Sequence, residues 1–275
     1  MDDWAGAFTL YLRTDRKTER TAQTYVETVR YFERWCCCRD LCLEEADREA
    51  IRLYLVEEQK RVSANTVVRA LAVLRKFYAW RDDDDHRTHG LRIKPEEIEP
   101  RLPLDREELT QLLAACRSDR DRVMVTLAHR LGLRLSELVG LRDEDVDLRR
   151  GLILIHRKGL KRQQLPIDAE LRDMLRPFLG TGYLWRLQTG GPMTTKRAKR
   201  MMQQLCERAD LRSHWHRLRT TFANEAIEAG IPIEQLRVLM GHKNLASTAR
   251  YAEHTIQLQA FEAMRRMTAG KLVAE

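Results

Sequence analysis

The stretch GHKNLASTARY places His242 nine residues before Tyr251, in a polar segment whose hydrophobic pattern requires no aromatic residue. A tyrosine hydroxyl becomes a nucleophile when neighbouring groups help it to lose its proton. Two interpretations follow: Tyr251 is a surface residue of an ordinary helix, or its phenol reaches a substrate that His242 also contacts. The stretch by itself favours a surface residue, so the rest of the chain has to decide.

A second pair of reactive side chains, His216 and Arg219, lies in HWHRLRTTF. The two residues are three positions apart, so on a helix they project from one face, with Leu218 and Phe222 on the buried side. A guanidinium binds phosphate oxygens in a bidentate manner, and a histidine beside it can donate or move a proton. The pair suits a phosphate group, although a solvated polar face explains the same pattern.

A third candidate is Arg134, in LAHRLGLRLSELVGL, where Gly132 ends one helix and a second helix begins near Ser136. An arginine in such a connection can point away from the domain surface. Glu137 either supports this arginine or simply favours the positive N-terminus of the helix. Alone, the motif is weak, because such an arginine is usually only solvated.

Taken in order, these stretches resemble the sequence boxes of the tyrosine recombinases, the phage-integrase family that includes the Xer proteins. LGLRLSEL resembles the first-arginine box, RKGLK the lysine-bearing hairpin, HRLR the His-x-x-Arg box, and MGHKNLASTARY the box that joins Gly-His to the nucleophilic tyrosine. The match covers about residues 105–255, and four boxes in this order are specific. The resemblance implies six catalytic residues: Arg134, Lys158, His216, Arg219, His242 and Tyr251.

The resemblance implies a site-specific DNA recombinase that cleaves and rejoins strands through a covalent 3′-phosphotyrosyl intermediate. A phenol has a pKa of about 10 and is a poor nucleophile at neutral pH. Arg134 and Arg219 would therefore clamp the non-bridging phosphate oxygens, and His216 would hydrogen-bond the phosphate and could accept the proton of Tyr251.

The remaining two groups would complete the chemistry. His242 would complete the ring of donors, and Lys158 would be the general acid that protonates the departing 5′ oxygen. Fixed cations then replace a divalent metal, so no metal, cofactor or ATP is expected. The family often has aspartate in place of Arg217 and histidine in place of Thr220. These departures bear on sub-family and local geometry, because neither residue belongs to the catalytic set.

The N-terminal part is predicted to be helical. In SANTVVRALAVLRKFYAW the residues Val67, Leu71, Leu74 and Tyr78 form one apolar stripe. Four such amphipathic helices can close a small bundle, and they resemble the core-binding, SAM-like domain of the family in size and helical character. The predicted helices cover residues 4–12, 21–37, 46–61 and 63–80.

The second part is predicted to be an α+β domain. Asp105 and Glu108 form a capping-box-like helix start. Residues 152–156 and 164–167 are short β-type runs, which predict a hairpin with Gly159 in its turn. The expected fold is mainly α with a small antiparallel sheet, and the resemblance implies the DNA breaking-rejoining type.

Three prolines, Pro95, Pro100 and Pro103, mark a connector between the helical bundle and the α+β domain, so three segments are expected. They are a core-binding domain over residues 1–85, a linker over 86–104, and a catalytic domain with a helical tail over 105–275.

Charge points to a polyanionic partner. Residues 1–98 carry 18 basic and 19 acidic residues, whereas the remainder carries 31 basic and 22 acidic residues. A basic second part suits double-stranded DNA, although a solvated basic surface would have the same charge. The candidate DNA contacts, each of which could equally be an ordinary solvated charge, are Lys196, Arg197, Lys199 and Arg200 in a predicted helix, and Arg69, Arg75 and Lys76 in the N-terminal bundle.

Composition excludes other classes. With 33% charged residues and no apolar run of roughly 18 residues, the chain does not suit a membrane protein. No secretion signal is visible, so a cytoplasmic protein with reduced cysteines is expected. Cys38 and Cys42 have the spacing of half a zinc site, but the other half is missing, and Cys36 falls in a helix-packing pattern.

The C-terminal segment carries Ile256, Phe261, Met264 and Met267 on one side of a short predicted helix. Family members commonly dock such a tail on a neighbouring protomer, so the resemblance implies a homotetramer on two DNA sites. A tail packed on its own domain is the alternative.

Two other functions stay open: a type IB topoisomerase that only relaxes supercoils, and a non-catalytic DNA-binding protein with the same fold. Retention of all six catalytic residue types argues against the last.

Overall fold

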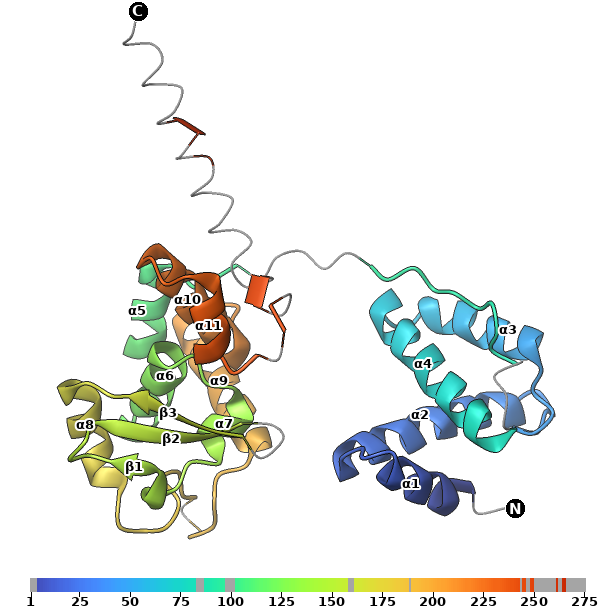
Figure 1. Ribbon diagram of the computed structural model, residues 1–275, viewed down its shortest axis with the longest axis horizontal. Coiled ribbons are helices and arrows are strands. Elements are labelled where there is room, and N and C mark those ends of the chain that lie inside the picture. Colours follow the sequence, from blue (N-terminus) through green and yellow to red (C-terminus); the bar gives the residue numbers. More distant parts are fainter. Residues whose placement is uncertain are drawn as a thin grey trace, which may run out of the picture. The chain divides into compact units, whose positions relative to one another are not determined.

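The structure is a computed structural model, and it divides the chain into two compact units, residues 1–98 and 99–275 (Figure 1). Among the described residues, no helix is both long and apolar enough to cross a lipid bilayer. The residues that the structure describes are 4–82, 87–96, 102–157, 161–187, 189–242, 244–245, 248–249, 261 and 264–265.

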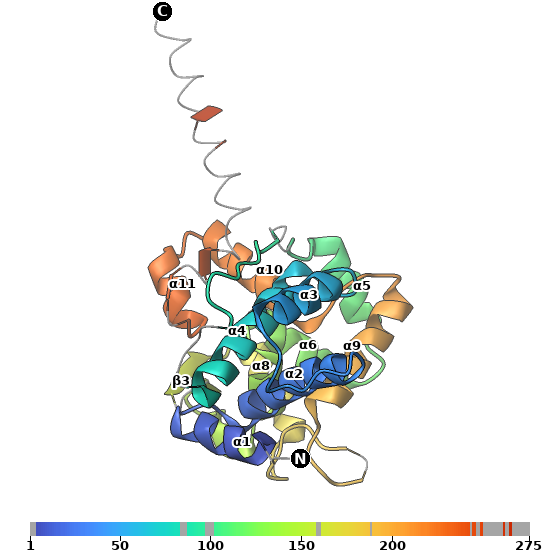
Figure 2. The ribbon, with the colours of Figure 1, turned by 90° about the vertical axis from the view of Figure 1, so that its right-hand side faces the viewer.

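The first unit is a bundle of four helices (Figures 1 and 2). Thr18 and Asp47 cap the second and third helices through their side chains, which explains where these helices begin. Phe8 and Trp4 pack edge-on against Phe77, so aromatic rings fill the core. The predicted four-helix bundle is confirmed, with ends shifted by up to two residues: α1 Trp4–Thr14, α2 Glu19–Cys37, α3 Arg48–Gln59 and α4 Ala64–Arg81.

The second unit is α+β, as predicted, and its helices surround a buried central helix, α6. The predicted capping box is present, because Asp105 accepts from the Glu108 backbone at 2.7 Å and Glu108 accepts from the Asp105 backbone at 3.0 Å. Met124 and Leu127 of α6 are fully buried. The helices are α5 Arg106–Ala114, α6 Asp119–Arg130, α7 Leu135–Val139, η1 Asp143–Asp145, α8 Ala169–Leu175, η2 Arg176–Phe178, α9 Thr195–Ala209, α10 Trp215–Glu228 and α11 Ile233–Leu239.

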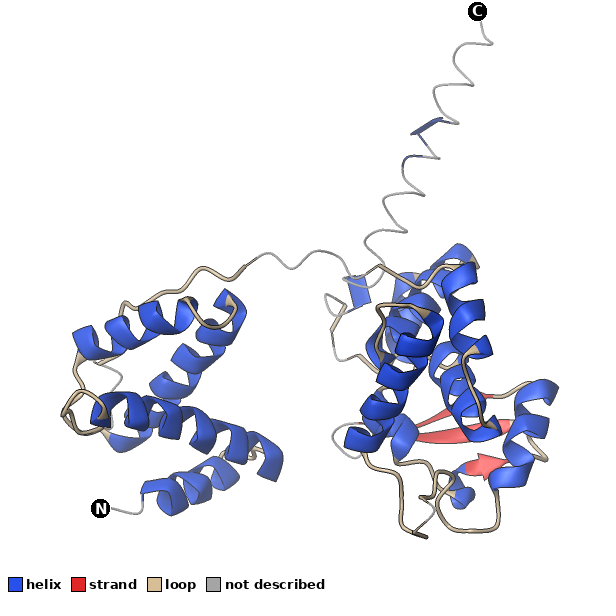
Figure 3. Ribbon diagram, turned by 180° about the vertical axis from the view of Figure 1, so that it is seen from behind, coloured by secondary structure: helices blue, strands red, loops and turns tan. Residues whose placement is uncertain are grey.

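The sheet has three antiparallel strands in the order β1-β2-β3, and Figure 3 shows it beside the helices of this unit. The predicted hairpin is formed by β2 (Leu152–Arg157) and β3 (Lys161–Pro166), and Gly159 lies outside the described residues. Sequence reasoning missed β1 (Val146–Asp147), which at two residues is too short to show an alternating pattern.

Both ends of the predicted 86–104 linker pack onto a unit. Leu91 lies in the core of the first unit, and Leu104 lies in the core of the second. The backbone N–H of Leu104 also donates to the hydroxyl of Thr221 at 2.8 Å. The predicted boundaries stay a prediction, but the stretch that packs on neither unit is shorter than 86–104.

Candidate active site

Four of the six predicted catalytic residues lie among the described residues. Arg134 is the N-cap residue of α7, His216 and Arg219 lie in the first half of α10, and His242 follows α11. These positions are far apart in the sequence. Hydrogen bonds described below connect Arg134, Arg219 and His242, and the charge of His216 acts on His242.

The other two, Lys158 and Tyr251, lie outside the described residues. Lys158 directly follows the last residue of β2, and Tyr251 comes three residues after Thr248.

Glu137 holds Arg134 by two hydrogen bonds. Its carboxylate accepts from the Arg134 backbone N–H at 2.8 Å and from Nη1 of the Arg134 guanidinium at 2.7 Å. The Arg134 side chain is 34% exposed. Of the two roles left open for Glu137, it fills both: it binds the orphan N–H at the start of α7 and fixes the direction of the arginine.

The connection before α7 lies against α10. Gly132 has φ +57°, and a Cβ there would lie 2.3 Å from Cδ1 of Phe222. Glycine is therefore required both by the left-handed backbone and by the close approach to the ring. The contact places the Gly132 carbonyl and the following Arg134 beside the residues of α10.

Arg157 is a member of the network that sequence reasoning missed. Its Nη1 donates to Glu137 at 2.6 Å, and both side chains are only 4% exposed. Burial lowers the pKa of Arg157, while the charge of Glu137 raises it. The signal was present in the sequence, because Arg157 follows Ile153 and Ile155 at the inward positions of β2.

Arg219 is fully buried and binds two loops at once. Nη1 donates to the carbonyl of Gly132, and Nη2 donates to the carbonyl of Met240 at 2.6 Å and to Nε2 of His242 at 2.8 Å. Because a guanidinium has no acceptor, Nε2 of His242 must accept, and its proton lies on Nδ1. Nδ1 is 2.8 Å from Oγ1 of Thr248, to which it donates.

Burial and the neighbouring positive charges keep the ring of His242 neutral. Burial lowers its pKa to about 4, and the positive charges of Arg219, Arg134 and Arg157 and that of His216 add to this shift. All four groups therefore lie close enough to act on one imidazole. A phosphate placed here would meet a concentrated positive potential, which is what an anionic transition state needs.

The two residues that depart from the family pattern have structural partners. Arg217 donates to Glu108 at 2.6 Å and to the carbonyl of Pro103 at 3.0 Å, so it ties α10 to the start of α5. Thr220 is buried, and its hydroxyl donates to the carbonyl of His216 at 3.2 Å.

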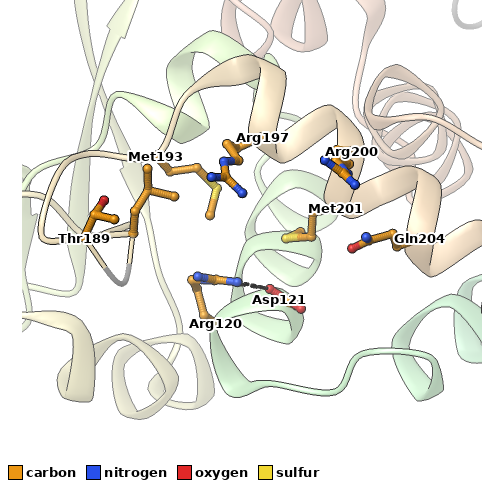
Figure 4. A pocket seen from close by; sticks show the side chains of 9 residues that line it. Arg120, Asp121, Thr189, Met193, Arg197, Arg200, Met201 and Gln204 are labelled. Atoms are coloured by element: carbon orange, nitrogen blue, oxygen red, sulfur yellow. Dashed lines mark hydrogen bonds and ion pairs between the residues drawn. The ribbon is translucent and has the colours of Figure 1, made fainter.

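Helix α9 presents the four predicted basic residues Lys196, Arg197, Lys199 and Arg200 as exposed side chains. Two of them, Arg197 and Arg200, line an open cavity of about 470 Å³ together with Arg120 at the start of α6 (Figure 4). Arg120 is paired with Asp121 at 3.0 Å. The cavity collects three guanidinium groups, and two of them come from the helix predicted to contact DNA.

The three basic residues predicted in the N-terminal bundle differ from one another. Arg69 is exposed on α4. Arg75 donates to the carbonyl of Leu91, and Lys76 forms an ion pair with Asp15 at 3.0 Å. Two of the three therefore have partners within their own unit.

The cysteines are all free thiols, and burial raises the pKa of Cys36 to about 12. In the part of the chain that the structure describes, no group of three or more His, Cys, Asp or Glu side chains is placed to hold a metal ion.

Two family models match the chain. Residues 103–257 match the phage integrase family, and residues 4–87 match the N-terminal SAM-like domain of phage integrases.

Two curated relatives cover nearly the whole chain. Tyrosine recombinase XerA of Thermococcus kodakarensis is 32% identical over 263 residues, which are 91% of this chain and 90% of the relative. Tyrosine recombinase XerC of Bacillus subtilis is 28% identical over 273 residues, 89% of each chain.

Solved structures share the fold. The Tn1549 transposon integrase in complex with transposon right end DNA gives a TM-score of 0.75 at 18% identity, over 96% of this chain and 99% of that one. A lambda integrase dimer bound to a COC′ core site gives 0.73 at 18% identity, over 90% of this chain and 75% of that one.

Proposed function

The chain belongs to the phage integrase family of tyrosine recombinases, and from this premise we propose that it is a site-specific recombinase of double-stranded DNA. It cuts and rejoins strands through a covalent 3′-phosphotyrosyl intermediate formed by Tyr251. The observation that carries the proposal is the network itself. Arg134, Arg219 and His242, which are distant in the sequence, are held together by Glu137 and by backbone carbonyls.

In this proposal the two arginines bind the scissile phosphate. Arg134 is partly exposed and already oriented by Glu137, so it can meet a non-bridging oxygen directly. Arg219 is buried, so its contact with the phosphate requires that its guanidinium become uncovered when DNA binds. Fixed positive charge then stabilises the pentacovalent transition state.

The remaining roles concern protons and the leaving group. His216 hydrogen-bonds the phosphate and accepts the proton of Tyr251, and Lys158 protonates the departing 5′ oxygen. His242 completes the donor ring only when Nε2 carries a proton. In the tautomer of the structure, it holds Arg219 instead. Tyr251 keeps the phosphodiester energy in the covalent bond, so a second 5′ hydroxyl can reverse the reaction without ATP. No metal is required.

The surrounding elements serve the DNA. The exposed basic residues of α9 contact backbone phosphates or enter the major groove, and Arg120 lies beside two of them. Arg69, Arg75 and Lys76 form a second contact in the core-binding domain, residues 1–85. The segment 86–104 links it to the catalytic domain, residues 105–275. A cytoplasmic location is part of the same proposal, because cellular DNA is the substrate.

In this proposal the chain assembles as a tetramer on two DNA sites, and its C-terminal segment docks on a neighbouring protomer. Phe261 and Met264, two of its described residues, are exposed apolar side chains. Docking on a neighbouring protomer would bury them. A chain truncated after His254 should lose strand exchange. If the truncated chain recombined as well as the full chain, tail exchange would be contradicted.

The decisive experiment compares the wild type with Tyr251→Phe on end-labelled DNA from around its own gene, in EDTA. We expect a protease-sensitive covalent adduct on a denaturing gel with the wild type and none with Tyr251→Phe, although both bind DNA. Tyr183→Phe, which also removes a tyrosine hydroxyl from the second unit, is the matched control and should form the adduct.

Other outcomes would point to other functions. DNA binding by the wild type without any adduct would favour a non-catalytic DNA-binding protein. Relaxation of supercoiled plasmid without strand exchange would favour a type IB topoisomerase.

A further inference from the structure

We propose that Arg157 is a positioning residue for strand cleavage, which sets the places of Arg134 and of the loop that carries His242. The inference rests on the proposed recombinase activity. Arg157 does not act on Arg134 or His242 by a direct hydrogen bond. It contacts the groups that hold these two residues.

The position of Arg157 is unusual for a charged residue. In β2 it lies opposite Lys161 and faces inward like Ile153 and Ile155, which are fully buried. An aliphatic residue would continue that pattern without the desolvation that a buried guanidinium requires. A buried ion pair is often no more stabilising than apolar residues of the same volume. The charge therefore calls for an explanation other than core stability.

Nη1 of Arg157 is connected to Arg134 through the Glu137 carboxylate, which binds both arginines. Oε2 of Glu137 accepts from Nη1 of Arg157 at 2.6 Å and from the Arg134 backbone at 2.8 Å, while Oε1 accepts from Nη1 of Arg134 at 2.7 Å. Glu137 is thus fixed on both sides. Without Arg157, the Glu137 carboxylate would lose a partner that fixes its rotation, and Arg134 would then lose its orientation.

The other two guanidinium nitrogens of Arg157, Nη2 and Nε, connect it to the end of α11. Nη2 of Arg157 donates to the carbonyl of Leu239 at 2.8 Å, and Nε donates to Gln163, whose amide donates to the carbonyl of Val238 at 3.0 Å. The bond to Leu239 satisfies a carbonyl at the end of the helix, and the carbonyl of Val238 accepts from the Gly241 backbone as well, at 2.9 Å. These bonds also anchor the point from which the chain turns toward His242.

The turn itself is fitted to Arg157. A Cβ on Gly241 would lie 2.9 Å from Nε and 3.0 Å from Cδ of Arg157, and Gly241 has φ +62°. The residue before His242 therefore lies directly on the guanidinium stem. One side chain, adjacent in sequence to Lys158, contacts both halves of the site.

Single-turnover cleavage separates positioning from folding. We expect Arg157→Met to slow cleavage by about 100-fold with DNA affinity unchanged, and Arg157→Lys to recover only part of the rate, because one ammonium cannot make all three hydrogen bonds of the guanidinium. The double variant Arg157→Met/Glu137→Gln removes both buried charges, so its urea midpoint should recover relative to Arg157→Met while its cleavage stays slow. Arg130→Met, which removes an arginine paired with Asp168 and Glu170, is the control and should cleave normally.

A modified substrate tests the route through Arg134. Replacing one non-bridging oxygen of the scissile phosphate by a methyl group removes the negative charge that Arg134 neutralises. The defect of Arg157→Met should then become about 10-fold smaller than on the phosphodiester. Equal defects on both substrates, or a cleavage rate that recovers together with the urea midpoint, would overturn the positioning role. A wild type that cleaves neither substrate would instead overturn the proposed function.

Discussion

The two units of the molecule bury different kinds of side chain. Among the described residues, the first unit buries no charged side chain, and its core is built from Phe, Trp, Tyr and aliphatic groups. The second unit buries Glu137, Arg157 and Arg219 in addition to an apolar core. Burying a charge has a desolvation cost even when the charge is paired. The unit that carries the reactive residues therefore accepts a cost that the other avoids.

The ion pairs of the two units show the same contrast. Arg39 and Glu57 of the first unit are about one-third exposed, and such pairs contribute roughly 0 to 1 kcal/mol. Arg157 and Glu137 are almost fully buried, and Glu137 also binds Arg134. The first unit is held by packing, whereas the second holds its buried charged groups in fixed positions.

Phe77→Ala tests the packing half of the comparison and has the largest expected effect. Phe77 is fully buried and contacts the rings of Trp4, Phe8 and Trp80, so its truncation should destabilise the first unit by about 3 to 5 kcal/mol. Hydrogen exchange followed by mass spectrometry should locate the loss of protection in residues 1–98. Tyr31→Ala, an exposed aromatic of the same unit, is the control. Equal loss of protection in both units would contradict the division.

Arg219→Lys tests the chemical half. Lysine keeps the charge but cannot bind the carbonyls of Gly132 and Met240 and Nε2 of His242 together. Cleavage should fall by about 100-fold to 1000-fold, which is about 2.7 to 4 kcal/mol, while DNA affinity is kept. Arg122→Lys, an exposed arginine of α6, should leave cleavage unchanged. Full cleavage by Arg219→Lys would show that the buried charge serves the fold alone.

Much of this contrast could be predicted from the sequence. Apolar stripes gave the four N-terminal helices, and Asp105 with Glu108 gave the start of α5. The motif boxes gave the family and brought Arg134 and His216 into consideration. Patterns of this kind depend only on residues close together in the sequence, so they can be recognised without knowing which distant segments are in contact.

The rest depends on contacts between distant segments. The inward position of Arg157 could be read from the strand pattern, but its partners could not, because Glu137 lies 20 residues earlier and Leu239 lies 82 residues later. The tautomer of His242 follows from Arg219, and no sequence pattern shows which nitrogen carries the proton. Burial of Arg219 was also unexpected, since a phosphate-binding arginine was pictured on an open helix face.

Gly241→Ala probes the fit between the His242 loop and the buried ion pair. The new Cβ would meet Arg157 within 3.0 Å in a left-handed backbone, so the second unit should lose about 1 to 3 kcal/mol of unfolding free energy and cleavage should slow. Gly230→Ala is a matched control, because Gly230 has φ +84° but no atom within 4 Å of a Cβ. If the two variants were equally stable and active, the contact with Arg157 would contribute nothing beyond backbone strain.

Burial of His242 is expected to make the stability of the second unit depend on pH. His242 has a pKa of about 4 in the folded chain against an ordinary value of 6.5, so between these values the unfolded chain binds a proton that the folded chain does not. Stability from this residue is complete above pH 6.5 and is lost as the pH falls toward 4, with a slope of at most about 1.4 kcal/mol per pH unit. Urea midpoints of the wild type and His242→Asn, measured from pH 4 to 7, should converge toward the acid end. Parallel curves would mean that the pKa of His242 is the same in the folded and the unfolded chain, so that burial and the neighbouring charges do not hold its ring neutral.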